Sequence, residues 1–230
     1  MVRTCVIMQP TYLPWAGYFN LILNADIFVF LDDVQFEKQS WQNRNKIIID
    51  SKEHLLSIPV KRNGLKTAIK DVLVDDTQKW RKKHISAISQ NYCGHKYYKN
   101  VKIVLDIIND STLIHLVDIN MSIIQSLCDI LSIKKEFIRS SELACAGTRS
   151  EKLVNVINHL NCNRYLSPIG SKTYIENDGV LSNTDIDIGY QNFKLKDYKQ
   201  KYMKSFISYL SIIDVIANLG ILGTQLYISD

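Results

Sequence analysis

Hydrophobic positions along the chain follow two spacings, one typical of buried strands and one typical of helices. Unbroken apolar runs at 4–8 and 27–31 predict buried strands. Residues 15–24 between them have helical spacing, so the segment is predicted to form a β-α-β unit with parallel strands. The same reasoning predicts further strands at 46–49, 55–60, 71–74, 135–139, 164–167 and 186–193, and helices at 80–91, 101–108, 113–131, 151–160 and 211–219.

This alternation of strands and helices indicates an α/β fold, mainly a parallel sheet with flanking helices. Residues 77–132 have helical spacing almost throughout, which predicts a helical insertion; a separate helical subdomain is the alternative. No low-complexity linker divides the 230 residues, so we expect residues 1–230 to form a single α/β domain. In the last predicted helix, Ser211 and Asp214 are spaced as in a capping box, and Gly220 is expected to end the helix.

The composition is that of a soluble globular protein, with 46% hydrophobic and 22% charged residues. The five cysteines are widely spaced and include no CxxC pair, which favours reduced thiols over a disulfide framework or a zinc site. No apolar run reaches the roughly 18 residues of a membrane span. We therefore expect a cytoplasmic protein without a membrane span, whose oligomeric state, including a homo-oligomer, stays open.

The positive charge lies in the first part of the chain. Residues 1–100 carry 15 basic and 9 acidic side chains, whereas the whole chain has a net charge of only +5. This excess suits an anionic small molecule such as a nucleotide, and no segment has the form of a nucleic-acid-binding module. We therefore expect a phosphate-bearing small molecule, and no nucleic acid, as the partner.

The segment QPTYLPWAGYF at residues 9–19 directly follows the first predicted strand. In parallel α/β sheets, ligands bind beyond the carboxyl ends of the strands, and the first loop is the usual cradle. The helix that follows also offers N-terminal amides to an anion. The alternative is that the prolines and aromatic residues only stabilise the turn. The binding candidates here are Gln9, Tyr12, Trp15 and Gly17.

A second polar segment, DDVQFEKQSWQNRNK at residues 32–46, follows the second predicted strand. Adjacent Asp32 and Asp33 point to opposite sides, so one of them is expected to face the cleft. Arg44 is notable because 21 lysines stand against seven arginines in this chain, and only arginine offers a planar bidentate fork. The donors and the one aromatic ring suit an oxygen-rich ligand; a solvated polar loop is the alternative. The candidates are Gln35, Lys38, Trp41, Asn43, Arg44 and Asn45.

Candidates outside these two segments are fewer. Ser167, Ser171 and Tyr174 follow a predicted strand end, where a second half of the site is expected, and Lys61 ends the stretch LLSIPVK. His84, Cys93 and His95 have irregular spacing, which favours ordinary helix and loop residues over a metal site. No metal is therefore expected.

Several of these stretches resemble one family. MQPTYLPWAGYF, LDDVQFEKQSWQNRNKI and LLSIPVK are similar to the N-terminal signature of the WbqC-like proteins, a bacterial family of O-antigen and other surface polysaccharide gene clusters. RYLSPIGSKTYI and YKQKYMKSFISYLSIIDVIANLG resemble its C-terminal pattern, so the likeness spans nearly the whole chain. The resemblance implies a role in surface glycan assembly.

The resulting hypothesis is an enzyme that modifies a nucleotide-linked amino sugar by acyl or aminoacyl transfer, with ATP or acyl-CoA as candidate donor substrates. Asp32 or Asp33 would act as base or orient the amine, Lys38 and Arg44 would hold phosphate, and Trp41 would stack on the sugar or base. One alternative is a non-catalytic sugar-nucleotide binder or assembly factor. Another is a glycosyltransferase, for which the DxD-like Asp185-Ile186-Asp187 fits in letters only.

Overall fold

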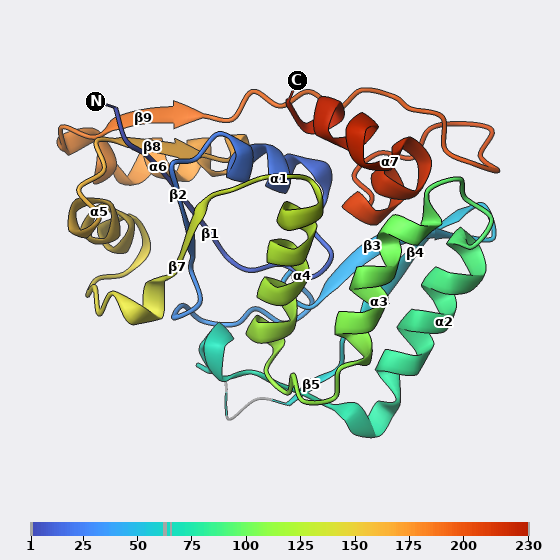
Figure 1. Ribbon diagram of the computed structural model, residues 1–230. Coiled ribbons are helices and arrows are strands. Elements are labelled where there is room, and N and C mark those ends of the chain that lie inside the picture. The colour runs from blue at the N-terminus through green and yellow to red at the C-terminus, as the bar shows by residue number, and fades with distance from the viewer. Residues whose placement is uncertain (1, 62–63, 65, 230) are drawn as a thin grey trace.

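The computed structural model, which describes residues 2–61, 64 and 66–229, is built on a five-stranded sheet (Figure 1). All neighbouring strands in this sheet are parallel, in the order β7-β2-β1-β8-β9, which confirms the predicted α/β class. The strands are β1 (Thr4–Met8), β2 (Ile27–Phe30), β7 (Glu136–Arg139), β8 (Arg164–Ser167) and β9 (Asp187–Tyr190).

The central strand is the first in the chain. Helix α1 (Ala16–Leu23) connects β1 to β2, which confirms the predicted β-α-β unit. The chain moves outward from β1 through β2 to β7 and then crosses to β8 and β9 on the other side of β1. The connection after β1 leads to β2 and the connection after β8 leads to β9, in opposite directions across the sheet. The carboxyl ends of β1 and β8 therefore form the crevice where ligands of such sheets bind.

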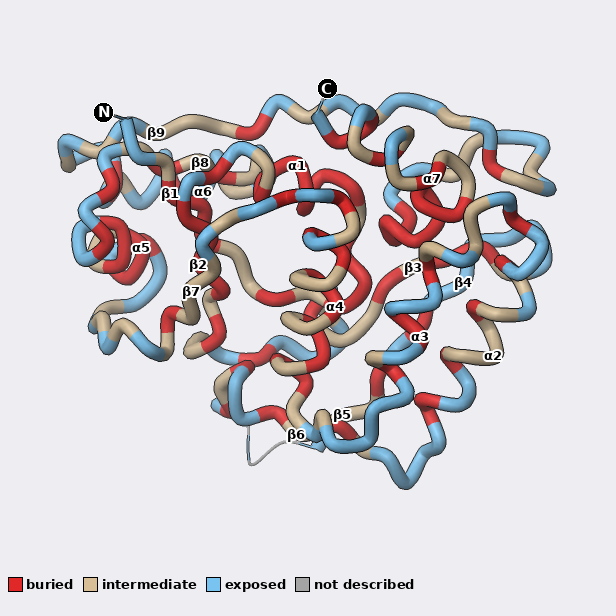
Figure 2. Tube along the Cα trace, in the orientation of Figure 1, coloured by how far each residue is buried: buried red, intermediate tan, exposed pale blue. Residues whose placement is uncertain are grey.

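The two faces of the sheet bury separate clusters because side chains alternate along each strand. Val6, Phe28 and Phe30 belong to the larger cluster, whereas Ile7 and Val29 belong to the smaller one. The larger cluster includes buried residues of α1, α4 (Leu116–Ile130) and α7 (Ile212–Ser229), and the smaller one those of α5 (Arg149–His159) and α6 (Lys172–Asp178). Figure 2 shows the buried trace running through the centre of the molecule.

The segment between β2 and β7 supplies two small sheets and then helices. The predicted hairpin is β3 (Arg44–Ile49) with β4 (Lys52–Ser57), and β5 (Val60–Lys61) pairs antiparallel with β6 (Leu73–Val74). Helices α2 (Trp80–Tyr92), α3 (Lys102–Asn109) and α4 occupy the predicted helical stretch. Short 3₁₀ turns lie at Ile69–Asp71, Asp76–Gln78, Tyr98–Val101, Ser140–Glu142, Ile169–Ser171 and Leu181–Asn183.

The last helix differs from its prediction in two respects. Gly220 does not end α7 but interrupts it, with a φ of 74° that the helix cannot hold, and helical turns resume to Ser229. A Cβ at Gly220 would lie 2.8 Å from the ring of Tyr97, so the close packing also requires glycine. Asp214 turns inward instead of capping, and its carboxylate accepts hydrogen bonds from Tyr92 Oη (3.0 Å) and Tyr198 Oη (2.6 Å).

Among the described residues, α7 is the one helix whose length and apolar composition suffice to cross a bilayer. More than half of it is buried within the protein, where it packs on α1 and on the 3₁₀ turn at Tyr98–Val101. Core packing therefore accounts for part of its apolarity, while Leu222 and Leu226 remain exposed.

Candidate functional site

A cleft lies beyond the carboxyl ends of the central strands and has two connected compartments. The large compartment, of about 1110 Å³, is lined by Gln9, Leu31, Asp33, Val34, Gln35, Glu37, Gly147, Thr148, Arg149, Lys152, Leu153, Tyr174, Asn177 and Asp178. The small compartment, of about 390 Å³, is lined by Ile7, Met8, Gln9, Thr11, Leu31, Glu37, Ser40, Trp41, Gln42, Leu153, Tyr165, Pro168, Ser171 and Tyr174.

The residues common to both compartments include Gln9 at the end of β1 and Glu37. The small compartment also reaches Pro168 just after β8, so the cleft occupies the expected crevice between β1 and β8.

Asp32 does not line the cleft but forms hydrogen bonds between neighbouring strand ends beside it. Its side chain is fully buried and accepts hydrogen bonds from Arg139 Nε (2.7 Å), Ser141 Oγ (2.9 Å) and the Ser141 backbone amide (3.0 Å). These donors lie at the end of β7 and in the turn after it. Asp32 therefore joins the ends of β2 and β7, and a carboxylate so fully used has a structural role.

Asp33 is the aspartate that faces the cleft. It forms an ion pair with Lys152 of α5, and Ser140 Oγ donates to its second oxygen. Lys152 also donates to the backbone carbonyl of Cys145 at 2.8 Å. The side chains of Asp33 and Lys152 are only 17% and 10% exposed, so each needs the other to be buried as an ion. The pair forms a fixed polar wall of the large compartment.

The N-terminus of α5 forms the basic end of the large compartment. Thr148 is the N-cap residue, and its backbone amide donates to the carboxylate of Glu151 (3.4 Å), as in a capping box. Gly147 before it has a φ of 101°, where side chains are strained, and a Cβ there would lie 3.0 Å from the Lys152 amide nitrogen. Together with Arg149 and Lys152, this helix start is suited to an anion such as phosphate.

Gln42 fixes the loop that crosses between the compartments. It is buried, its Nε2 donates to Gln9 Oε1 (2.9 Å), and its Oε1 accepts from the Glu37 amide (3.1 Å). Asn120 of α4 donates to the Gln42 carbonyl (2.7 Å). This chain of bonds ties the loop to β1 and α4, so the side chains that the loop presents to the cleft are held in place.

Three aromatic residues line the small compartment: Tyr165 is buried, whereas Trp41 and Tyr174 have exposed rings. Trp41 is 50% exposed and Tyr174 of α6 is 43% exposed, and Pro168 and Ser171 lie on the β8 side. Exposed rings above a concave surface are suited to stacking on a sugar or a nucleobase. The compartment therefore has the surface chemistry of a ring-binding site.

The structure brings some of the predicted residues together and not others. Those that line the cleft are Gln9, Asp33, Gln35, Trp41, Ser171 and Tyr174. Those that do not are Asp32, Lys38, Tyr12, Trp15, Gly17, Asn43, Arg44, Asn45, Lys61 and Ser167.

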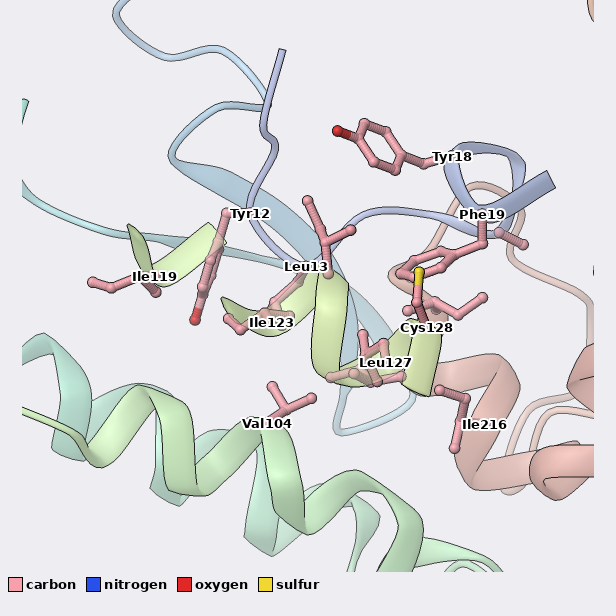
Figure 3. Packing of buried hydrophobic residues seen from close by; sticks show 14 of the residues in the cluster. Tyr12, Leu13, Tyr18, Phe19, Val104, Ile119, Ile123, Leu127, Cys128 and Ile216 are labelled. Carbon is pink, nitrogen blue, oxygen red and sulfur yellow. The ribbon is translucent and has the colours of Figure 1, made fainter. Parts of the chain in front are cut away.

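Tyr12 and Asn45 belong to the interior. The Tyr12 hydroxyl hydrogen-bonds with His84 Nδ1 of α2 (2.9 Å), and Figure 3 shows its ring beside Ile119 in the larger cluster. Burial raises the pKa of Tyr12, which keeps the phenol neutral. Asn45 donates to the backbone carbonyls of Tyr12 (3.1 Å) and Leu13 (2.7 Å). Both residues therefore shape the first loop from behind.

The other predicted residues lie away from the cleft. The ring of Trp15 covers Gly17 and packs against Phe193 of the C-terminal segment, which is the turn-stabilising alternative. Lys61 pairs with Asp75 (3.4 Å), and Arg44 begins β3. Lys38 is exposed in its loop, and Ser167 is fully buried at the end of β8.

Sequence reasoning missed the residues of the α5 start. Gly147, Thr148 and Glu151 carry a signal, because a glycine before a capping box after a predicted strand marks a helix N-terminus at the ligand edge of the sheet. Lys152 carries no such signal, since its partner Asp33 lies 119 residues earlier.

Asp187 of the DxD-like motif does not line this cleft. Asp187 lies at the amino end of β9 and pairs with Arg164 (3.4 Å), at the opposite edge of the sheet. The described part of the chain holds no group of three or more His, Cys, Asp or Glu residues placed to bind a metal ion.

The comparisons with known proteins name one family. The chain is 28% identical over 222 residues to the uncharacterized protein Rv1507c of Mycobacterium tuberculosis (strain ATCC 25618 / H37Rv), covering 95% of each chain. No solved structure shows a significant match. The family model described as the WbqC-like protein family matches residues 9–225. The chain therefore belongs to the WbqC-like protein family.

Proposed function

We propose that the protein is a cytoplasmic enzyme of bacterial surface polysaccharide biosynthesis that acylates or aminoacylates the amine of a nucleotide-linked amino sugar. The single observation that carries this proposal is the division of the cleft. One compartment has a helix N-terminus with two basic side chains, Arg149 and Lys152, and the other has two exposed rings, Trp41 and Tyr174. A nucleotide-linked sugar has the matching parts, namely charged phosphates and flat or ring-shaped groups.

In this proposal the phosphates lie at the start of α5. Arg149 and the backbone amides after Thr148 hold the phosphate oxygens, and the Lys152 ammonium adds positive charge. Asp33 keeps Lys152 in place through their ion pair. The basic residues of the α5 start take the roles that sequence reasoning gave to Lys38 and Arg44.

The chemical step joins the sugar amine to an activated carboxyl group. The amine attacks in its neutral form: its nitrogen bonds to the carboxyl carbon of the donor, the bond between that carbon and its leaving group breaks, and the proton released by the nitrogen leaves with the leaving group as the amide forms. The large compartment, at about 1110 Å³, exceeds the size of ordinary ligand pockets and has space for a donor beside the sugar. Acyl-CoA and ATP with a free acid are the candidate donor substrates.

A non-catalytic sugar-nucleotide binder is the second candidate, and one observation favours it. Both carboxylate oxygens of Asp33 are already engaged, one by Lys152 and one by Ser140. A carboxylate used in this way positions its neighbours and has little capacity left to accept a proton. A binder would show ligand affinity equal to that of the enzyme but would form no product.

Thermal-shift measurements against nucleotide sugars, ATP and acyl-CoA test the binding step. A ligand at 100 times its Kd stabilises the native state by about 2.7 kcal/mol, which is readily measured. We expect stabilisation by a nucleotide-linked amino sugar, and its loss in Arg149→Ala but not in the control Lys82→Ala, an exposed lysine of α2. Mass spectrometry of a mixture with the donor then separates enzyme from binder. Absence of stabilisation by every nucleotide sugar contradicts the proposal.

A further inference from the structure

Glu37 stands apart from the other acidic residues of the cleft. The carboxylates that line the two compartments belong to Asp33, Glu37 and Asp178. Asp33 is held by Lys152 and Ser140, and Asp178 accepts hydrogen bonds from Ser150 Oγ and from the Val180 amide. Among the described residues, no donor bonds the carboxylate of Glu37. The one unengaged acid of the cleft is therefore Glu37.

The backbone of Glu37 is nevertheless fixed. Its amide donates to Gln42 Oε1 (3.1 Å), and its carbonyl accepts from Ser40 Oγ (2.8 Å). The residue before it, Phe36, is buried in the larger cluster, and its amide donates to the Thr67 carbonyl (2.9 Å). Because the backbone is already held, only the exposed side chain of Glu37 has to be ordered when a ligand binds.

The charge pattern of the cleft indicates which ligand group Glu37 would meet. Arg149 and Lys152 line only the large compartment. Of the residues that line the small compartment, Glu37 is the one with a charged side chain, and it stands with the rings of Trp41 and Tyr174. The large compartment therefore combines these two cations with three carboxylates, whereas in the small compartment the negative charge of Glu37 stands alone beside the ring-binding surface.

We infer that Glu37 is a specificity-determining residue that binds the protonated amine of a phosphate-bearing amino sugar, and so selects it over the corresponding neutral sugar. The inference rests on the proposed function, since it names the group that the same cleft recognises. A carboxylate that accepts a charge-assisted hydrogen bond from an ammonium group discriminates against a hydroxyl group in the same position. The neutral sugar leaves that negative charge without a partner.

The test compares two probes that differ in one group. Glucosamine 1-phosphate and glucose 1-phosphate carry an amine and a hydroxyl, respectively, on the same ring carbon. Isothermal titration calorimetry at about pH 6.5 keeps the amine protonated. For the wild-type chain we expect the amino sugar phosphate to bind about tenfold or more tightly, which is the usual contribution of a charged hydrogen bond. The preference is expected to fall as salt is added.

The variant Glu37→Gln is expected to remove this preference by weakening the amino sugar phosphate alone, with glucose 1-phosphate changed by less than about twofold. Glu37→Asp keeps the charge at a shorter reach and is expected to keep part of the preference. Glu53→Gln, which alters an exposed carboxylate paired with Lys46 in the β3–β4 hairpin, is the matched control and is expected to keep all of it.

The outcomes separate this inference from the proposed function. If both probes bind and Glu37→Gln keeps the preference, the role of Glu37 is overturned while the sugar-phosphate cleft stands. If Glu37→Gln weakens both probes equally, Glu37 acts on the loop and not on the amine, which also overturns the inference. If neither probe binds the folded wild-type chain, the inference is overturned, whereas the proposed function is decided separately by the thermal-shift measurements with nucleotide sugars.

Discussion

The ion pair between Asp33 and Lys152 joins the loop after β2 to helix α5 across the wall of the cleft. The two residues are 119 positions apart in the chain, and both side chains are largely withdrawn from solvent. Through this pair, the basic start of α5 is held against the sheet edge that carries Gln9. The geometry of the large compartment therefore depends on one buried contact.

Removing one partner of this ion pair is expected to lower the free energy of unfolding. Lys152→Met leaves the Asp33 carboxylate buried without its cation, which costs about 3–5 kcal/mol of folding free energy. The double variant Asp33→Asn, Lys152→Met is expected to regain most of that loss, since no unpaired charge remains. Urea denaturation of the wild type, both single variants and the double variant gives the coupling energy. Additive losses would show that the two groups do not interact in solution.

Gly17 is expected to tolerate no side chain while Trp15 is present. A Cβ at Gly17 would lie 2.2 Å from Cζ2 of the Trp15 ring, so the ring must move and lose its contacts with Phe193. Gly17→Ala is therefore expected to destabilise the fold by about 1–3 kcal/mol or more. In a Trp15→Ala background the same substitution should cost much less. Thermal denaturation of the four chains checks this, and equal costs in both backgrounds would contradict the packing argument.

His84 makes stability depend on pH on the acidic side of neutrality. Burial lowers the pKa of His84 to about 4 from its usual value of 6.5. Below pH 6.5 the unfolded chain binds a proton that the native His84 excludes, so stability falls as the pH drops towards 4. A shift of this size corresponds to about 3 kcal/mol. Denaturation of His84→Gln across this range should show a smaller loss than the wild type, and parallel curves would rule His84 out as the source.

Asp214 is expected to give the opposite dependence. Burial raises the pKa of Asp214, although hydrogen bonds from Tyr198, Tyr92 and Gln200 partly oppose it. The native state therefore holds a proton that the unfolded chain has released, and stability falls as the pH rises from the usual aspartate range through the raised pKa. Asp214→Asn should lack this fall. Denaturation midpoints measured upward from about pH 4 provide the comparison, with Asp50→Asn as an exposed control.

The sequence was sufficient to predict the strands of the sheet. It was not sufficient to predict which loop side chains face the cleft and which are buried. Strands β1 and β2 are unbroken apolar runs, which both faces of a covered parallel sheet require, so their existence and pairing could be predicted. The first loop does follow β1 at the carboxyl edge of the sheet, where Gln9 and Thr11 line the cleft. The direction of Tyr12 could not be predicted, because its partner His84 lies 72 residues further on.

The orientations of Asp33 and Glu37 towards the cleft could not be predicted for the same reason, because they depend on residues far away in the sequence. Alternation along the chain required Asp32 and Asp33 to point apart, but only the position of β7 beside β2 decides that Asp32 is the buried one, through Arg139. Glu37 had no distinguishing neighbours in the sequence. Its position between the compartments follows from the bonds of Gln42 to Gln9 and Asn120, which connect three separate parts of the chain.

The central position of β1 also constrains when the protein can fold during synthesis. β1 finds β2 within the first 30 residues, but its other neighbour, β8, begins only at Arg164, and α7 packs on α1 from the far end of the chain. The ribosome must therefore release most of the polypeptide before the central strand has both neighbours. Until then, one edge of β1 stays unpaired, and a nascent chain of this topology is exposed to aggregation and to capture by chaperones.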